Sequence, residues 1–244
     1  MEDILIYNVG SRKTDFVIDR MPDTGIRRKF FVDDIHTDDN IDSLNPWYCE
    51  ITALYHLIRN TTEPIIGLEH YRSNLYEDDG QQLMSAETIH SLLEKYDVIA
   101  GVWDYRKAKD GISLKKNLDL WLHRELNVLY DVIRSTDAEF MQAVDKYILP
   151  REGEHIACNI FIARREIIAE YFNYMMEICR KYDEVSPLGQ DNLRRDGYIW
   201  EFLFGAYINY KGLKLKKSRM IKRTKTLNGI QGETKVWNES PHIV

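Results

Sequence analysis

Short apolar runs alternate along the chain with longer segments whose apolar residues recur every three or four positions. Four runs have the length of buried strands, at 4–7, 64–68, 97–101 and 155–163. Segments with helical spacing lie at 45–60, 85–96, 113–134, 138–148, 164–182 and 198–210. Strands that alternate with helices are typical of an α/β sheet with mainly parallel strands. We also expect short strands at 16–18 and 30–32, on either side of a turn at 22–25.

The segment 45–72 carries the clearest candidate chemistry. Asn45 is a candidate cap for the first of these helices, and Pro46 suits a first helical position. The helix is expected to end at 60–62, before the strand at 64–68. Directly beyond that strand come the side chains of Glu69, His70, Tyr71 and Arg72. Ligands of open α/β sheets bind beyond the carboxyl ends of strands, so a site is expected here first.

Two further polar clusters fall near the same predicted edge of the sheet. One follows the strand at 97–101 and consists of Trp103, Asp104, Tyr105, Arg106 and Lys107. The other is the acidic segment 33–40, which has two interpretations. It is either a solvated loop before the helix or a wall of the site that holds a ribose, a sugar or a cation.

Three polar residues stand inside apolar elements further along the chain. Asn159 lies within the strand at 155–163, and a buried amide without a partner costs about 1–3 kcal/mol. It therefore either makes a bond in the core or faces the cleft. Glu201, on the helix at 198–210, is either at the solvent edge or a paired buried charge. His123 lies on a leucine-rich helical segment and is interpreted as structural.

Composition and charge narrow the class of protein. The 244 residues suffice for a sizeable core, and we expect a single domain over 1–244. A net charge of -6 argues against a general nucleic-acid-binding protein. The three cysteines lack CxxC spacing, which indicates neither a zinc site nor a disulfide framework and fits a reducing cytoplasm. We expect no signal peptide, and the sequence contains no run of about 20 apolar residues.

The segment 211–225 is basic, with eight Lys or Arg residues and no acidic residue. Two interpretations are equally supported, and a third, nucleic-acid binding, is weakened by the overall negative charge. The lysines either keep an exposed strand soluble or attach the protein peripherally to the inner face of an anionic membrane. In the second case each basic residue near the surface contributes about 1 kcal/mol.

Three blocks of sequence carry a resemblance to a known family. They are NPWYCEITALYHLIRN with IIGLEHYR, then HIACNIFIARREIIAEY, then RRDGYIWEFLFGAYI. In content and order they resemble a bacterial family of small glycosyltransferases of capsular and exopolysaccharide biosynthesis, formerly a domain of unknown function. The likeness spans 3–221. Glu69, Ser73 and Phe202 depart from the family's usual Cys, Arg and Arg, which leaves the donor and the acceptor open.

The resemblance implies a GT-A-like fold, with a mostly parallel sheet flanked by helices and added C-terminal helices. It implies transfer of a sugar from a nucleotide-sugar donor, such as a UDP-hexose, to a lipid-linked or growing glycan. The diphosphate of the donor is then expected to contact His70, Tyr71, Arg72, Asp39 and Asn40.

Negative charge develops on the leaving diphosphate, and a cation or basic side chains can stabilise it. In one arrangement Glu69 and His70, helped by Asp38 or Asp39, hold Mg²⁺ or Mn²⁺. In the other, His70 and Arg72 neutralise the diphosphate without a metal. We favour the second, because the family form has no acidic residue at the position of Glu69.

An inverting transfer also needs a carboxylate that takes the proton of the acceptor hydroxyl. Asp104 and Asp191 are the candidates. Residues expected to shape the site are Glu69, His155, Asn159 and Glu201. Glu50 lies on the helix that leads to the site, and a capping or salt-bridge role suits it equally well.

Two other functions fit the same residues. One is a non-catalytic protein of the same fold that binds a nucleotide sugar or a glycan. The other is a phosphate-ester hydrolase, which would need a dedicated nucleophile or a metal cluster, and no such motif is evident.

Overall fold

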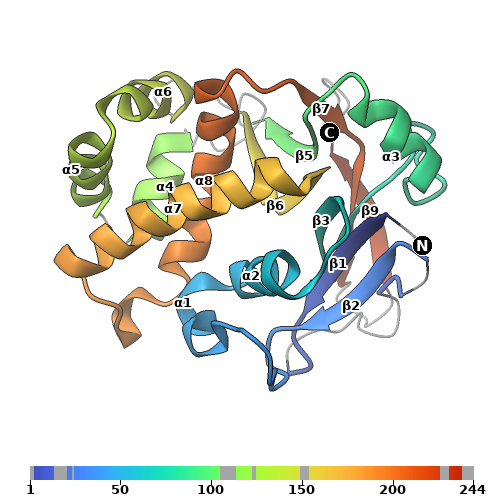
Figure 1. Ribbon diagram of the computed structural model, residues 1–244, viewed down its shortest axis with the longest axis horizontal. Coiled ribbons are helices and arrows are strands. Elements are labelled where there is room, and N and C mark those ends of the chain that lie inside the picture. Colours follow the sequence, from blue (N-terminus) through green and yellow to red (C-terminus); the bar gives the residue numbers. More distant parts are fainter. Residues whose placement is uncertain are drawn as a thin grey trace.

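The computed structural model describes residues 3–13, 21–23, 25–104, 114–122, 125–148, 154–225 and 231–237. Its strands are β1 (Ile4–Gly10), β2 (Arg27–Phe31), β3 (Ile65–His70), β4 (Ser73–Leu75), β5 (Val98–Asp104), β6 (Glu154–Arg164), β7 (Leu215–Ser218), β8 (Met220–Lys225) and β9 (Gln231–Trp237). Its helices are α1 (Asn45–Tyr48), α2 (Ile51–Asn60), α3 (Ala86–Leu93), α4 (Leu114–Trp121), α5 (Leu126–Thr136), α6 (Ala138–Ile148), α7 (Arg165–Val185) and α8 (Arg195–Tyr210). Figure 1 shows how the strands form one twisted sheet and how the helices surround it.

The centre of the sheet is mostly parallel, as predicted. Its strands follow the order β2-β1-β3-β6-β5-β7. Strand β1 is parallel to β2 and β3, and β5 is parallel to β7, whereas β6 is antiparallel to both β3 and β5. All strands of this path except β6 therefore run in one direction. Strands β4, β8 and β9 extend the sheet from β3 as an antiparallel branch.

Helices cover both faces of the sheet, and strand periodicity explains how each face is buried. In β1, Leu5 and Tyr7 pack into a large core that α2 and α5–α8 share. Ile4 and Ile6 point the other way, into a smaller core closed by α3. Because successive side chains of a strand alternate between faces, β1 must be apolar on both. The predicted fold class, a mixed α/β sheet flanked by helices, is confirmed.

A glycine in β3 permits the close approach of β6. A Cβ added to Gly67 would lie 2.7 Å from the carbonyl oxygen of Phe161 and 2.9 Å from the side chain of Ile162. Real Cβ atoms essentially never come this close to backbone, so only glycine fits between the two strands. The strand that carries the candidate site is thereby held tightly against β6.

The helix predicted over 45–60 is broken, and the break shapes the site. Leu44, not Asn45, occupies the capping position of α1, and Asn45 is the first residue of that helix. Cys49 then adopts φ 53° and ψ -128°, which ends α1, and α2 begins at Ile51. A positive φ is unusual for a residue other than glycine. The prediction of one continuous helix capped by Asn45 is wrong.

Other elements follow the sequence pattern with fewer surprises. The helical segment predicted at 113–134 consists of two helices, α4 and α5, and the predicted strand at 16–18 and His123 lie outside the described residues. Strand β4 was not predicted. No helix within the described ranges is both long and apolar enough to cross a bilayer.

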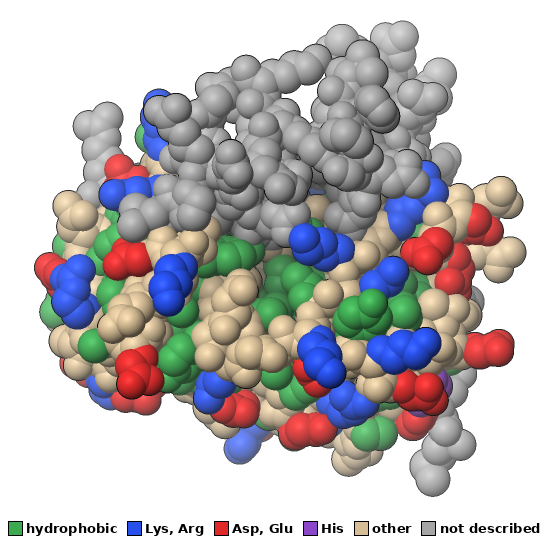
Figure 2. Space-filling model, turned by 90° about the horizontal axis from the view of Figure 1, so that it is seen from above, with side chains coloured by type: hydrophobic (Ala, Val, Ile, Leu, Met, Phe, Trp, Pro, Cys, Tyr) green, Lys and Arg blue, Asp and Glu red, His purple; other side chains and the backbone are tan. Residues whose placement is uncertain are grey.

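The basic segment 211–225 begins directly after α8 and contains β7 and β8. Lys211 forms an ion pair with Glu170 at 2.7 Å, and Lys216 lies 3.9 Å from Asp78. Figure 2 shows acidic and basic side chains interspersed over the coloured part of one face of the molecule. Membrane attachment through this segment stays a prediction.

Candidate functional site

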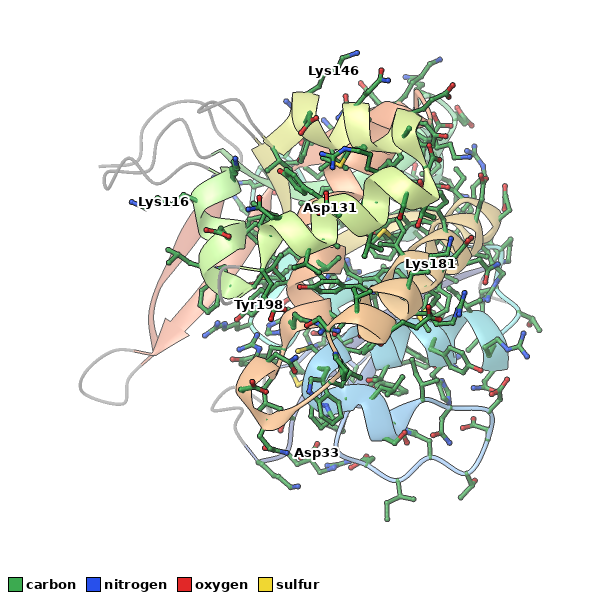
Figure 3. The ribbon with its side chains drawn as sticks, turned by 90° about the vertical axis from the view of Figure 1, so that its left-hand side faces the viewer. Asp33, Lys116, Asp131, Lys146, Lys181 and Tyr198 are labelled. Carbon is green, nitrogen blue, oxygen red and sulfur yellow. The ribbon has the colours of Figure 1, made fainter. Side chains whose placement is uncertain are left out.

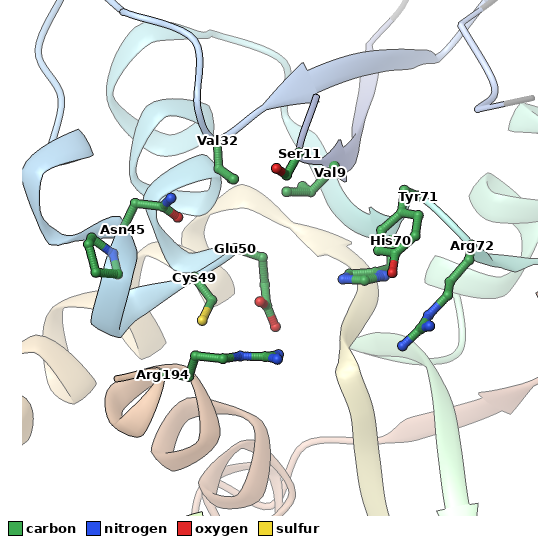
Figure 4. A pocket seen from close by; sticks show the side chains of 12 residues that line it. Val9, Ser11, Val32, Asn45, Cys49, Glu50, His70, Tyr71, Arg72 and Arg194 are labelled. Carbon is green, nitrogen blue, oxygen red and sulfur yellow. The ribbon is translucent and has the colours of Figure 1, made fainter. Parts of the chain in front are cut away.

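A pocket of about 330 Å³ opens at the carboxyl ends of β1 and β3. The break between α1 and α2 closes one side of it, and the residue before α8 closes another (Figure 4). Its lining residues are Val9, Gly10, Ser11, Val32, Asn45, Pro46, Cys49, Glu50, His70, Tyr71, Arg72 and Arg194. The pocket thus lies at the edge of the sheet where a ligand was expected.

His70, Tyr71 and Arg72 are brought together in this pocket. The backbone N–H of Tyr71 donates to the carbonyl of Val9 at 2.7 Å, which fixes the turn after β3 against the end of β1. The rings of His70 and Tyr71 lie 4.4 Å apart. Nε of Arg72 is buried and has no hydrogen-bond partner among the described residues. A guanidinium with an unsatisfied buried donor is suited to receive an anionic ligand.

Glu69 does not face this pocket. Its carboxylate accepts hydrogen bonds from Nε and Nη2 of Arg27, from Nδ2 of Asn74 and from the backbone N–H of Leu75, all at 3.0 Å. Side chains alternate along β3, so Glu69 and His70 point to opposite faces of the sheet. The placement of Glu69 therefore does not support the predictions that it shapes the site or holds a metal with His70.

The acidic segment 33–40 supports the pocket from outside rather than lining it. Asp38 accepts a hydrogen bond from His56 at 2.8 Å, and Asp39 accepts from Tyr55 at 2.7 Å and Arg59 at 2.9 Å. The amide of Asn40 donates to backbone carbonyls within its own loop. None of these three residues is among those that line the pocket. The prediction that Asp39 and Asn40 contact the donor, and that Asp38 or Asp39 completes a metal site, is therefore not supported by their placement.

Asp33, at the start of the same segment, does reach the pocket wall. Its carboxylate accepts from the hydroxyl of Ser11 at 3.2 Å and from the backbone N–H of Arg12 at 3.0 Å. Because Ser11 lines the pocket, the acidic segment holds the end of β1 in place.

Two charged residues of the pocket wall, Glu50 and Arg194, were not assigned to the site from the sequence. The guanidinium of Arg194 reaches the thiol of Cys49, and Figure 4 shows it below the carboxylate of Glu50. Burial raises the pKa of Glu50 to about 7. The nearby charge of Glu201 raises it further, whereas the hydrogen bond from Asn159 and the charge of Arg194 lower it. The pocket therefore combines cationic groups with a carboxyl group that titrates near neutrality.

The start of α8, which places Arg194, is anchored by a buried ion cluster. Arg195 is fully buried, lies 3.1 Å from the carboxylate of Asp196 and also pairs with Asp183. Burial raises the pKa of Asp196 to about 7. The backbone N–H of Arg194 donates to the carbonyl of Pro46 at 2.9 Å. These contacts fix the beginning of α8 against α1.

Asn159 and Glu201 support the pocket through Glu50 and β6. Nδ2 of Asn159 donates to Oε1 of Glu50 at 2.8 Å, and Glu201 accepts from the backbone N–H of Cys158 at 2.9 Å. Asn159 is 2 % exposed, so its amide is buried and partnered. The alternatives that the sequence left open are resolved: Asn159 makes a core bond, and that bond holds a residue of the pocket.

The non-glycine residues with positive φ in the described chain gather around this pocket. They are Cys49, Cys158, Asn159 and Arg194, with φ between 51° and 66°. Such conformations cost about 1–3 kcal/mol each and cluster at functional sites. Their convergence on one pocket, from three separate parts of the sequence, marks it as the candidate active site.

The carboxylates predicted to act as the base are placed less favourably. Asp191 lies in the 3-10 turn Gln190–Asn192, is exposed, and does not line the pocket. Its prediction as the base is not supported. Asp104 and His155 belong to the adjacent ends of β5 and β6, where Asp104 pairs with Glu154 and Trp103 with His155. The side chains of Asp104 and His155 lie outside the described part of the structure, and their roles stay predictions.

An aromatic pair lies beside the start of α8. Tyr198, labelled in Figure 3, stacks on Trp121 of α4 with ring centroids 4.5 Å apart. The guanidinium carbon of Arg194 lies 5.2 Å from the centre of the Tyr198 ring. The cation that faces the pocket is thus supported by an aromatic ring.

The described residues also test whether the protein could hold a metal at this place. They contain no group of three or more His, Cys, Asp or Glu side chains arranged to bind a metal ion. Since Glu69 is turned into its ion pair with Arg27, the ligand set suggested by the sequence does not fit a divalent cation.

Comparisons with known proteins agree with this fold. The structure is similar to the apo structure of the WbbM bifunctional glycosyltransferase, with a TM-score of 0.70 and 19% sequence identity. The similarity covers 89% of this chain and 45% of that one, so the chain spans under half the length of the protein it matches. No curated protein matches the sequence. The family described as domain of unknown function DUF4422 matches residues 18–212, which is most of the chain. The chain therefore belongs to the DUF4422 family.

Proposed function

We propose that this protein is a glycosyltransferase that transfers a sugar from a nucleotide-sugar donor to a glycan or lipid-linked glycan acceptor. The observation that carries the proposal is the pocket at the carboxyl ends of β1 and β3, where His70, Arg72 and Arg194 surround one cavity. The fold shared with the WbbM bifunctional glycosyltransferase supports it. The donor that we propose is a UDP-hexose, and the product a precursor of a capsular or other cell-surface polysaccharide.

The basic residues of the pocket can stabilise the negative charge that develops on the leaving diphosphate. Departure of the sugar leaves negative charge on the diphosphate, and fixed donors aimed at that charge stabilise the transition state. Arginine presents five N–H donors in a planar fork that matches phosphate oxygens. Arg72 approaches from the turn after β3 and Arg194 from the start of α8, on different sides of the pocket (Figure 4). We propose that they hold the diphosphate between them, with His70 and Tyr71 beside it.

In this proposal the side chains, not a metal ion, neutralise the diphosphate. Two arginines line the pocket, whereas the carboxylate of Glu69 is engaged by Arg27. Donor binding is expected to survive a chelator. Binding that disappears with EDTA and returns with Mn²⁺ would replace this arrangement with a metal-dependent one.

The proposal is tested with a panel of UDP-, GDP- and dTDP-sugars. We expect one of them to raise the Tm of the protein and to be hydrolysed slowly without an acceptor. We also expect sugar transfer when extracted polysaccharide or lipid-linked precursors are added. Stabilisation without hydrolysis or transfer would favour the non-catalytic binding protein, and no stabilisation by any donor would refute the proposal.

A further inference from the structure

We propose that Glu50 is the catalytic base of this transfer, that Asn159 positions its carboxylate, and that the reaction inverts the configuration of the sugar. This inference rests on the proposed function and deepens it, since it assigns the group that activates the acceptor. Glu50 lies at the start of α2, just after the break at Cys49, and lines the same pocket as Arg72 and Arg194.

The carboxylate of Glu50 is held by a side-chain hydrogen bond and lies at the wall of the pocket. Oε1 accepts the hydrogen bond of the Asn159 amide at 2.8 Å. No residue in the described ranges other than Asn159 donates a side-chain hydrogen bond to Glu50. Figure 4 shows the carboxylate pointing into the space between Arg194 and His70. The Asn159 amide thus holds the carboxylate in place at the pocket wall, where an acceptor hydroxyl can reach it.

The backbone that holds this carboxylate is unusual on both sides of the contact. Cys49, the residue before Glu50, has φ 53°, and Asn159 and Cys158 have φ 51° and 55°. A continuous helix over 45–60 would change the position of Glu50, and a regular β6 would change that of Asn159. Strained backbone conformations persist where the surrounding structure enforces them, often at sites of function. Here both strained segments end in the same hydrogen bond.

The electrostatic surroundings tune Glu50 for proton transfer near neutral pH. It faces Glu201 and Tyr198 of α8 and Arg194 just before that helix. Cys49 faces it from the helix break and Asn159 from β6. His70 and Arg72 line the opposite wall. Burial is the main reason that the pKa of Glu50 rises to about 7, and the charge of Glu201 adds to it. A general base is most effective when its pKa lies near the working pH.

The proposed step balances as a direct displacement. The acceptor oxygen attacks the anomeric carbon while Glu50 takes the hydroxyl proton, and a new glycosidic C–O bond forms. The bond between the anomeric carbon and the phosphate oxygen breaks, and its electron pair leaves with the nucleoside diphosphate. The products are the glycoside, the nucleoside diphosphate and a protonated Glu50, which then returns its proton to water.

The first test separates the base from donor binding. We expect Glu50→Gln to bind the stabilising nucleotide sugar with unchanged affinity but to lower kcat about 10²–10⁴-fold. Glu177→Gln serves as a matched control, because Glu177 is on the surface of α7, where it pairs with Lys181. If the wild type binds none of the nucleotide sugars, the proposed function is refuted. Normal binding with undiminished kcat in Glu50→Gln refutes the present inference alone.

The second test uses two variants that move the pH dependence of kcat in opposite directions. Glu201→Gln keeps an acceptor for the N–H of Cys158 but removes a charge that raises the pKa of Glu50. The acid limb of the kcat–pH profile should therefore move to lower pH. Asn159→Gly keeps the positive φ but removes the bond that lowers that pKa, so the limb should move to higher pH. A residue with a purely structural role would change kcat without these opposite shifts.

The stereochemical course completes the test. Proton NMR of the first product formed by the wild type should show the anomeric configuration opposite to that of the donor. A retained configuration, or acid limbs that shift together in Glu201→Gln and Asn159→Gly, would overturn the assignment of Glu50.

Discussion

Arg27 of β2 holds Glu69 of β3 through two guanidinium nitrogens, each 3.0 Å from a different carboxylate oxygen. Both side chains are buried, and the same guanidinium also donates to the carbonyl of Met84 at 2.9 Å. This pair fixes which face of β3 belongs to the smaller core. His70, the next residue, consequently points into the pocket.

Breaking this pair should destabilise the protein without removing a residue of the site. We expect Arg27→Met to lower the free energy of unfolding by about 3–5 kcal/mol, because it leaves the Glu69 carboxylate buried and uncompensated. Urea unfolding measures the change. The double variant Arg27→Met/Glu69→Leu should recover much of the loss. A single variant as stable as the wild type would contradict the structural role assigned to Glu69.

Arg194 should contribute to donor binding through its side chain and not through its backbone. Arg194→Asn is the suitable variant, because asparagine tolerates the positive φ at this position and keeps the N–H bonded to Pro46. Loss of one charge-assisted interaction with the diphosphate, about 1.5–3 kcal/mol, corresponds to a roughly 10–100-fold weaker Kd. Calorimetric titration with the stabilising nucleotide sugar measures it. Arg134→Asn, at an exposed position of α5, is the control. An equal Kd for the nucleotide sugar in the two variants would show that Arg194 does not bind the diphosphate.

The free energy of unfolding should depend on pH through the ionisation of Glu50. Its folded-state pKa, about 7, lies above the ordinary value of 4.5, so the folded chain keeps a proton that the unfolded chain has released between these pH values. Stability from this group therefore falls as the pH rises from about 4.5 to about 7 and is constant above. Glu50→Gln lacks this loss.

We expect the Tm of Glu50→Gln to exceed that of the wild type increasingly from pH 5 to pH 7.5. The gain in free energy is limited to about 3 kcal/mol by the size of the pKa shift. Differential scanning calorimetry at several pH values provides the measurement. A difference in Tm that stays constant with pH would show that the carboxyl group of Glu50 titrates normally.

The apolar pattern predicted the sheet and its helices because both are buried on recognisable faces. β1, β3, β5 and β6 are near-continuous apolar runs, as strands covered on both sides must be. For the same reason the pattern could not tell which face of β3 points toward which core. Strand periodicity separates Glu69 from His70, yet only the ion pair with Arg27, 42 residues earlier, decides which of the two reaches the pocket.

The place of His70, Tyr71 and Arg72 at the end of β3 could be predicted, because the end of a strand is visible in the local sequence. Glu50 and Arg194 could not be placed in this way. The helix break depends on a positive φ at Cys49, a residue type that gives no such signal, and Arg194 comes from a segment more than 140 positions away. A sequence signal for Arg194 did exist, since it stands in the polar run before α8, but nothing local indicated which of its neighbours would face the cavity.

The most direct test of the account is a calorimetric titration of the stabilising nucleotide sugar into the wild type and into the double variant His70→Ala/Arg72→Gln. If these side chains bind the diphosphate, the loss of two charge-assisted contacts should weaken Kd by at least about 100-fold, while circular dichroism and Tm show a folded protein. An unchanged Kd in the folded double variant would contradict the claim that this pocket receives the activated sugar.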